Sequence, residues 1–273
     1  MTMSDAQFAH VTTVLRSKLG IHIEADKRPM LTARFRHMVR NAGCTSFEQY
    51  FNRFLAQPNK STLSMLADKL STNHTFFWRE AAHFEAFRDV VLPEARTRHE
   101  KDHDIRIWCA AASMGQEPYT LVMLMRELFG PAYGSWQLGV LATDISDRAL
   151  TIARKGEYDA DDVERLPAAM RAKYMQPQGK GRFQVRADIR DQVTYRRLNL
   201  VNDKWLFKGR FDCVFLRNVL IYFNLETKRA LLERMAMYMV PNGVIFVGIT
   251  ETLRTFAPQF QMVQPGMYRK VNS

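Results

Sequence analysis

The sequence has 273 residues, 47% of them hydrophobic, and a formal net charge of +11, which together predict a globular protein with an acidic partner: nucleic acid, anionic lipid or an acidic protein surface. No apolar run approaches the roughly 18 residues that cross a bilayer, and the N-terminus lacks a signal-peptide core, so we expect a cytoplasmic protein without membrane insertion. Three scattered cysteines and seven histidines without metal-ligand spacing argue against a disulfide framework and against a metal site.

Apolar residues at helical spacing dominate the first 90 residues. Helices are predicted over residues 5–19, 26–41, 47–55 and 63–70, and no convincing strand precedes residue 105. We therefore expect an all-α N-terminal domain over residues 1–90, with a linker helix to about residue 100.

The second predicted helix is rich in basic residues. Lys27, Arg34, Arg36 and Arg40 lie largely away from its apolar side. A solvated face is the simpler interpretation, but the net charge favours a docking surface for an acidic partner.

The segment STNHTFFWRE, residues 71–80, places three aromatic residues among polar ones. Three consecutive aromatic residues usually belong to a core. Asn73, Thr75 and Arg79 are then caps and a surface charge, or they face a ligand. On sequence alone the structural interpretation is favoured.

Residues 105–130 predict a strand, a loop of small residues and a helix. In an open α/β sheet this junction is where nucleotide-like ligands bind, and small residues such as Ala111 and Gly115 let a ligand approach the backbone. The loop is neither GxGxxG nor a Walker A sequence, so a phosphate is not the expected ligand. A plain crossover is the alternative.

A second predicted strand, residues 137–142, is followed by Asp144. An acidic residue in this position binds ribose hydroxyls in such folds. The alternative is a helix cap, but Ser146 already supplies a good cap for the next helix. Ligand binding is therefore favoured for Asp144.

The rest of the chain predicts a small β insertion, about residues 156–195, before the main sheet resumes. The insertion has short helices and strands over 182–185 and 193–198. A strand over 211–216, a helix capped by Asn224, a strand over 243–249 and a hairpin over 260–270 complete the sheet. The loops around Ala111, Asp144 and Asn218 are expected to converge on one crevice.

Five motifs, TNHTFFWRE, WCAAASMGQEPYT, ATDIS, LNL and FLRNVLIYF, follow one another from residue 72 to residue 223. Together they resemble the chemotaxis receptor methyltransferases, the CheR family of protein-glutamate O-methyltransferases. The N-terminal helices and the insertion match as well. Many members read STGEEPYS in the second motif, so this chain retains Glu117 but has Gln116 in place of an acid.

The resemblance implies an α/β fold, a Rossmann-like sheet typical of S-adenosylmethionine-dependent methyltransferases over residues 101–273. It also implies S-adenosylmethionine as the cofactor and no metal. The residues implied to bind that cofactor are Asn73, Thr75, Arg79, Ala111, Glu117, Asp144, Asn199, Leu200, Asn218 and Val219.

The expected catalytic residues are Arg79 and Tyr222. A glutamate carboxylate is ionised at neutral pH, so methyl transfer needs positioning rather than a general base. Arg79 is expected to orient one carboxylate oxygen, and Tyr222 to donate a hydrogen bond. A buried core tyrosine is the alternative for Tyr222.

The family's substrate is a set of glutamates on the cytoplasmic helical bundle of chemoreceptors, and this acidic rod gives Lys27, Arg34, Arg36 and Arg40 a specific role. The basic loop QPQGKGR looks short, so we expect no tether to a receptor's C-terminal pentapeptide, and we expect a monomer. A nucleic-acid methyltransferase is disfavoured because no Asn/Asp-Pro-Pro-aromatic loop is present. A non-catalytic receptor-binding homologue is disfavoured by Arg79, Asp144 and Asn218.

Overall fold

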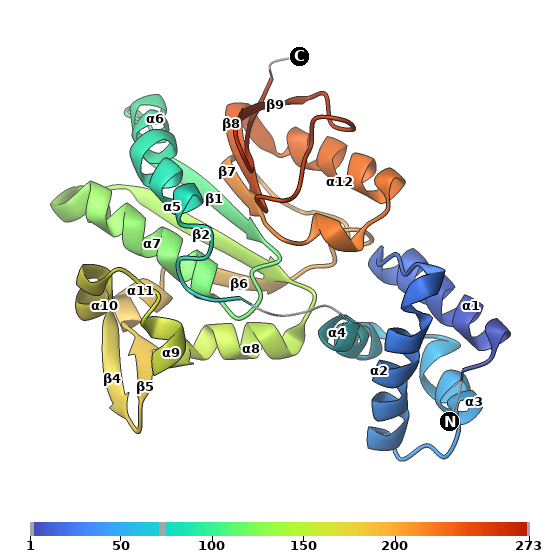
Figure 1. Cartoon of the computed structure of the whole chain (residues 1–273). Coiled ribbons are helices and arrows are strands. Elements are labelled where there is room, and N and C mark those ends of the chain that lie inside the picture. The colour runs from blue at the N-terminus through green and yellow to red at the C-terminus, as the bar shows by residue number, and fades with distance from the viewer. Residues whose placement is uncertain (1–2, 71–74, 272–273) are drawn as a thin grey trace.

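A computed structural model describes residues 3–70 and 75–271, and it confirms an all-α N-terminal domain (Figure 1). Its first helix begins with a capping box, in which Ser4 Oγ accepts from Gln7 N and Ser4 N donates to Gln7 Oε1. The helices of this domain are α1 (Asp5–Val14), continued by a π-helical turn (Leu15–Leu19), a 3₁₀ turn (Ala25–Lys27), α2 (Arg28–Asn41), α3 (Phe47–Tyr50), continued by a π-helical turn (Phe51–Leu55), and α4 (Lys60–Leu70).

The N-terminal core ends at Leu70, earlier than the boundary predicted near residue 90. The next helical stretch comprises α5 (Ala81–Ala86), a π-helical turn (Phe87–Val91) and α6 (Leu92–Arg98). Its Phe84, Phe87 and Leu92 are buried in the core of the main sheet. Because their apolar faces cover the sheet, these helices belong to the second domain.

The second domain is built on a seven-stranded sheet whose order is β6-β2-β1-β7-β8-β10-β9. The first five strands in that order are parallel, and the final hairpin is antiparallel, as the sequence predicted. The strands are β1 (Asp104–Ala110), β2 (Gln137–Asp144), β6 (Val193–Arg197), β7 (Phe211–Leu216), β8 (Met239–Val247), β9 (Phe260–Gln264) and β10 (Met267–Lys270).

Successive side chains of β1 point to opposite faces of this sheet, and both faces are buried. Ile107 and Cys109 pack in the cluster that contains α7 (Gln116–Phe129) and α8 (Asp147–Lys155). Trp108 packs in the opposite cluster with α12 (Leu225–Met237), and its Nε1 donates to Thr143 Oγ1 at 3.0 Å. Two layers of helices thus fix the strand ends that carry the site. A 3₁₀ turn (Gly130–Ser135) links α7 to β2.

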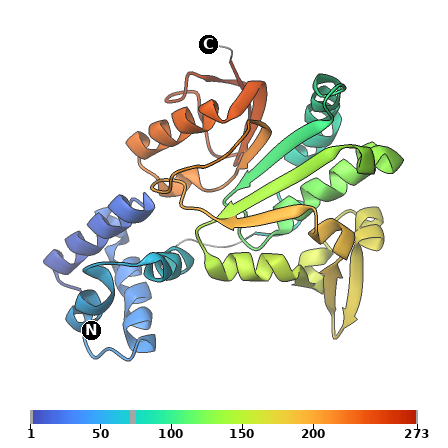
Figure 2. The same ribbon diagram turned by 180° about the vertical axis from the view of Figure 1, so that it is seen from behind.

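The β insertion is smaller than predicted. It is a three-stranded antiparallel sheet with three short helices, and the strand expected over residues 193–198 is not part of it. That strand is β6, which lies parallel to β2 in the main sheet (Figure 2). The apolar Val193 and Tyr195 alternate with polar residues, which predicted a strand but carried no information about its partner. The insertion consists of β3 (Glu157–Asp159), α9 (Ala160–Val163), α10 (Ala168–Tyr174), β4 (Met175–Gly179), β5 (Arg182–Val185) and α11 (Ala187–Arg190).

Within the described part of the chain, none of the helices combines the length and apolar character needed to cross a bilayer.

A buried carboxylate, Asp212, lies near the amino end of β7, at the opposite ends of the strands from the site. Asp212 is 2% exposed and accepts from Arg98 Nη1 at 2.9 Å and from Arg106 N at 3.1 Å. His99 places Nε2 2.8 Å from Asp212 Oδ1 and Nδ1 2.8 Å from Asp102 Oδ1. Burial lowers the pKa of His99, but its hydrogen bonds to Asp212 and Asp102 outweigh burial, so the pKa is raised.

The substitution His99→Gln should therefore have a pH-dependent effect on stability. The native pKa lies above the unfolded value of about 6.5, so the stabilisation by His99 is complete below that pH and is lost as the pH rises through the native pKa. Urea unfolding of both proteins at pH 6 and pH 9 should give a smaller difference in the free energy of unfolding at pH 9. An equal difference at both pH values would show that His99 is not protonated in the native state.

Candidate functional site

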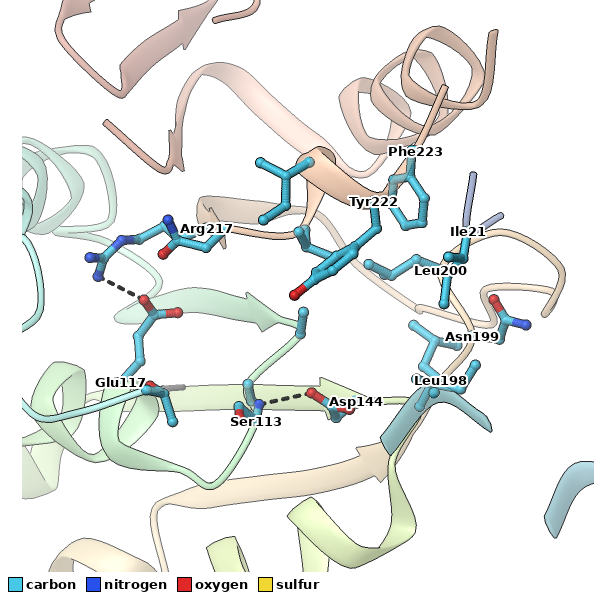
Figure 3. Close-up of a pocket in the computed structure, with 18 of the residues that line it drawn as sticks. Ile21, Ser113, Glu117, Asp144, Leu198, Asn199, Leu200, Arg217, Tyr222 and Phe223 are labelled. Carbon is cyan, nitrogen blue, oxygen red and sulfur yellow. Dashed lines mark hydrogen bonds and ion pairs between the residues drawn. The ribbon is translucent and has the colours of Figure 1, made fainter. Parts of the chain in front are cut away.

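A cavity of about 450 Å³ lies at the carboxyl ends of β1, β2 and β7 (Figure 3). The loops around Ala111, Asp144 and Asn218 all line it, as predicted. Leu19, Ile21 and Ala67 of the N-terminal domain form part of the wall. The volume is within the range of roughly 300–1,000 Å³ that is usual for cofactor and small-molecule sites.

The cavity brings together every described residue that the sequence analysis assigned to the cofactor or to catalysis. Asn73 lies outside the described residues. The assigned residues that line the cavity are Thr75, Arg79, Ala111, Glu117, Asp144, Asn199, Leu200, Asn218, Val219 and Tyr222. The basic residues of α2 do not line it. The individual roles of all these residues stay predictions.

The loop between β1 and α7 has a left-handed backbone at several residues. Ala111 and Ser113 adopt φ values of 66° and 49°, which cost a non-glycine residue about 1–3 kcal/mol each. Gly115 has φ 96°, and a Cβ there would lie 2.8 Å from Tyr195 Oη and 2.9 Å from Ala153 Cβ. Glycine is therefore required at residue 115 by packing against protein, and Gly115 does not line the cavity.

Asp144, the last residue of β2, bridges two backbone segments. Its Oδ2 accepts from Ser113 N at 2.8 Å, and its Oδ1 accepts from Ser146 N at 2.9 Å. Burial raises the pKa of Asp144 against these hydrogen bonds, and the nearby Asp68 charge raises it further. Because a carboxylate has about four lone-pair sites, Asp144 can still accept hydroxyl donors from the cavity.

Arg217 is a central residue of the site to which the sequence analysis assigned no role. Its side chain is 3% exposed, and its guanidinium lies 3.1 Å from Glu80 Oε2 and 2.8 Å from Glu117 Oε2. It also donates to the carbonyl of Arg79. Figure 3 shows the ion pair with Glu117 at one end of the cavity. Arg217 is the first residue of the RNV sequence in the fifth motif. A lone arginine after a strand, however, does not reveal which residues it will contact.

The two carboxylates that contact Arg217 have further partners. Burial raises the pKa of Glu80, but the hydrogen bond with His83 and the contacts with Arg217 and Asn218 lower it to about 2. Cys109 Sγ donates to Glu117 Oε1 at 2.8 Å. Burial raises the pKa of this thiol, so Cys109 stays protonated and can act as a donor. The carboxylates of Glu80 and Glu117 are therefore gathered around one guanidinium.

Glu251 is a second residue that the sequence analysis missed. It is 7% exposed, and its Oε2 accepts from Gly248 N at 2.6 Å and from Asn218 N at 2.9 Å. Its Oε1 accepts from Ile221 N at 3.1 Å. These bonds fix the loop that carries Val219 and Tyr222. The polar sequence TETLR gave no sign that this glutamate is buried.

The same loop is held from its other side by the N-terminal domain. His22 N donates to the carbonyl of Tyr222 at 2.8 Å, and Ile21 forms an antiparallel bridge with Phe223. Tyr222 is half-buried, and its ring reaches into the cavity (Figure 3). Tyr222 thus packs at the edge of the core and also faces the space where a ligand would lie.

Arg79 and Asn199 occupy different environments in the wall. Arg79 is half-buried, with Cζ 5.9 Å from the centroid of the Phe76 ring. The side chain of Asn199 is used by protein contacts, because its Nδ2 donates to the carbonyl of Lys18 at 2.7 Å and its Oδ1 accepts from Val201 N at 3.0 Å. Asn199 therefore joins the N-terminal domain to the cavity.

The basic residues of the second helix differ in exposure. Lys27, just before α2, and Arg40 are exposed, whereas Arg34 and Arg36 are half-buried. Arg34 Nη1 donates to the carbonyl of Leu70 at the end of α4. Arg34 thus has a structural contact within the N-terminal domain, and Lys27 and Arg40 are the more accessible charges.

Two family models match the chain. Residues 6–71 match "CheR methyltransferase, all-alpha domain", and residues 73–268 match "CheR methyltransferase, SAM binding domain". Among curated proteins, the chain is 35% identical to chemotaxis protein methyltransferase 1 of Pseudomonas aeruginosa, with 98% of each chain covered. It is 32% identical to the chemotaxis protein methyltransferase of Escherichia coli over 96% of this chain and 90% of the relative. The corresponding protein of Borreliella burgdorferi is 30% identical over 97% and 94%.

Arg217→Met should destabilise the protein by about 3–5 kcal/mol, because it removes a buried cation and leaves the half-buried carboxylates of Glu80 and Glu117 without it. Denaturant unfolding measures the loss. Arg254→Met is the matched control at an exposed arginine and should change the free energy of unfolding by less than about 0.5 kcal/mol. Equal, small losses in both variants would mean that Arg217 does not balance the two carboxylates.

Proposed function

The chain belongs to the CheR methyltransferase family, and on that premise we propose that it transfers a methyl group from S-adenosylmethionine to glutamate side chains of chemoreceptors. Methyl transfer from this cofactor in chemotaxis follows from the family. The glutamate acceptor and the receptor substrate are the proposal. The single observation that carries it is the convergence of Glu117, Asp144, Arg79 and Tyr222 on one cavity.

The donor set of the cavity fits S-adenosylmethionine. Asp144 presents carboxylate lone pairs for a ribose diol at the end of β2. Glu117, 15% exposed in its side chain, is an anion that suits the ammonium group of the methionine moiety. Leu200, Val219 and Ile145 offer apolar surface for an adenine ring. Gln116 stands where many family members have an acid, but it does not line the cavity, so this difference does not alter the donor set directly.

The acceptor chemistry requires orientation more than proton transfer. When bound, S-adenosylmethionine supplies a sulfonium methyl group that a carboxylate oxygen can take, while the electron pair of the broken S–C bond stays on sulfur. A glutamate side chain has a reference pKa of about 4.3, so its carboxylate is already the nucleophile at neutral pH. The remaining task is to hold one oxygen in line at near-attack distance.

Arg79 and Tyr222 are the residues proposed for that task. A guanidinium can bind one oxygen of the glutamate carboxylate and leave the other free for methylation. The Tyr222 hydroxyl can donate a second hydrogen bond from the opposite loop. Both side chains line the cavity, and both loops are fixed by carboxylates: the half-buried Glu80 and the buried Glu251.

The proposed docking surface for the receptor is the basic face of the N-terminal domain. Lys27 and Arg40 are its accessible charges, with Arg34 and Arg36 contributing from half-buried positions. An acidic helical bundle is complementary to this face, and long-range attraction of this kind weakens with salt. We further propose that the protein acts in the cytoplasm as a monomer. The two-residue turn between β4 and β5 supports recognition without a pentapeptide tether.

The assay that tests the proposal is transfer of labelled methyl groups from S-adenosylmethionine to purified cytoplasmic fragments of chemoreceptors. We expect label on the receptor that mild alkali removes, because methyl esters are base-labile. Fragments with and without the C-terminal tail should be labelled equally. Absence of receptor label despite tight cofactor binding would refute the receptor substrate, and RNA would be tested next. Absence of label on either substrate would indicate a non-catalytic homologue.

Two variants separate catalysis from cofactor binding. Arg79→Ala should abolish turnover while weakening S-adenosylmethionine binding much less. Tyr222→Phe should lower kcat about 10- to 100-fold, the effect of one hydrogen bond to a charged group. Tyr133→Phe, a buried tyrosine remote from the cavity, is the matched control and should keep wild-type kcat. Equal losses of turnover and cofactor affinity would mean that Arg79 only binds the cofactor.

Reversal of the accessible charges tests docking. The double variant K27E/R40E should raise KM for receptor fragments on the order of tenfold at low salt and flatten the dependence of KM on salt. The control K204E/K208E changes net charge equally at exposed residues in the loop between β6 and β7. If both variants raise KM alike, net charge rather than the basic face of the N-terminal domain governs docking.

A further inference from the structure

The loop that follows β2 is held by side chains of the N-terminal domain. Ser146 Oγ donates to the Asp68 carboxylate on α4. One turn earlier on α4, the buried Ser64 Oγ accepts from Asp147 N at 2.9 Å. Ser146 and the first residue of α8, Asp147, are therefore bound across the domain boundary, close in sequence to Asp144.

Ser146 connects Asp68 to the Asp144 carboxylate. Its N–H donates to Asp144 Oδ1 at 2.9 Å, and its Oγ accepts from Ala149 N at 2.8 Å as the N-cap of α8. A serine hydroxyl has a single proton to donate. Since Asp68 accepts the hydrogen bond that this proton makes, it fixes the rotation of the hydroxyl and the backbone position from which Ser146 N reaches Asp144.

We propose that Asp68 is a positioning residue for the cofactor site: acting through Ser146, it holds the Asp144 carboxylate in the orientation that the ribose hydroxyls of the cofactor require. This inference rests on the proposed function, in which Asp144 binds that ribose. It makes the N-terminal domain part of the cofactor site as well as a docking module.

Two observations set Asp68 apart from an ordinary contact between domains. Its neighbour Ala67 lines the same cavity as Asp144. The Asp68 charge is also close enough to raise the pKa of Asp144. The ion pair of Arg16 with Glu226, by contrast, is exposed and joins the domains away from this loop.

The test compares two ligands by calorimetry: S-adenosylhomocysteine and its 2′,3′-dideoxy form, which lacks the ribose hydroxyls. Asp68→Ala should raise Kd about tenfold for S-adenosylhomocysteine and leave Kd for the dideoxy form within about twofold. Asp68→Asn keeps an acceptor oxygen and should recover most of the affinity. Lys69→Ala, the exposed neighbour on α4, should bind both ligands like the wild type.

Ser146→Ala should show the same selective loss, and the double variant D68A/S146A should lose little more than the larger single loss, because both residues act through one hydrogen bond. Equal losses for both ligands, or no loss, would overturn the inference. Asp144→Asn distinguishes a wrong assignment of Asp144 from a wrong assignment of Asp68. If it fails to lose affinity selectively for the ribose-bearing ligand, the assignment of Asp144 is wrong. If Asp144→Asn loses affinity selectively for the ribose-bearing ligand and Asp68→Ala does not, only the role of Asp68 is wrong.

Discussion

A single buried guanidinium, that of Arg217, holds the site together. It contacts Glu80 and the carbonyl of Arg79 on one segment, and Glu117 on another that is remote in sequence. Removing a cation from water is costly unless anions and hydrogen bonds compensate it, and here two carboxylates do so. The segment with Arg79, the first βα turn and the end of β7 can therefore move only if this cluster breaks.

Much of the site could be predicted because parallel strands end at one edge of a sheet. The apolar run of β1, the small-residue loop and Asp144 after β2 were each readable from local pattern, and topology then brings them together. The same holds for the final antiparallel hairpin, which turns at Pro265 and Gly266. Local periodicity and strand order together were enough to locate the cavity.

What the sequence could not show are pairings between distant segments. The alternation of apolar and polar residues over 193–197 predicts a strand equally well in the insertion or in the main sheet. Its place is set by pairing with β2, which has no other strand on that side among the described residues. Glu251 sits among polar residues, yet three backbone N–H groups from two loops converge on it. Asn199 lines the cavity, and its amide also binds the carbonyl of Lys18 in the N-terminal domain, a contact that the sequence did not reveal. Each outcome depends on a partner far away in the chain.

The N-terminal domain contacts three walls of the cavity, through Lys18 with Asn199, His22 with Tyr222, and Asp68 with Ser146. This arrangement has a consequence for the proposed reaction. In-line attack tolerates errors of only about 1 Å before the rate falls about a hundredfold. A docking domain on a flexible linker would raise the local concentration of the substrate without aligning it. These hydrogen bonds fix the domain to the loops that carry Asp144 and Tyr222. Under the proposed function, a receptor docked at Lys27 and Arg40 would therefore be held in a defined position relative to the cofactor, and docking would contribute orientation as well as affinity.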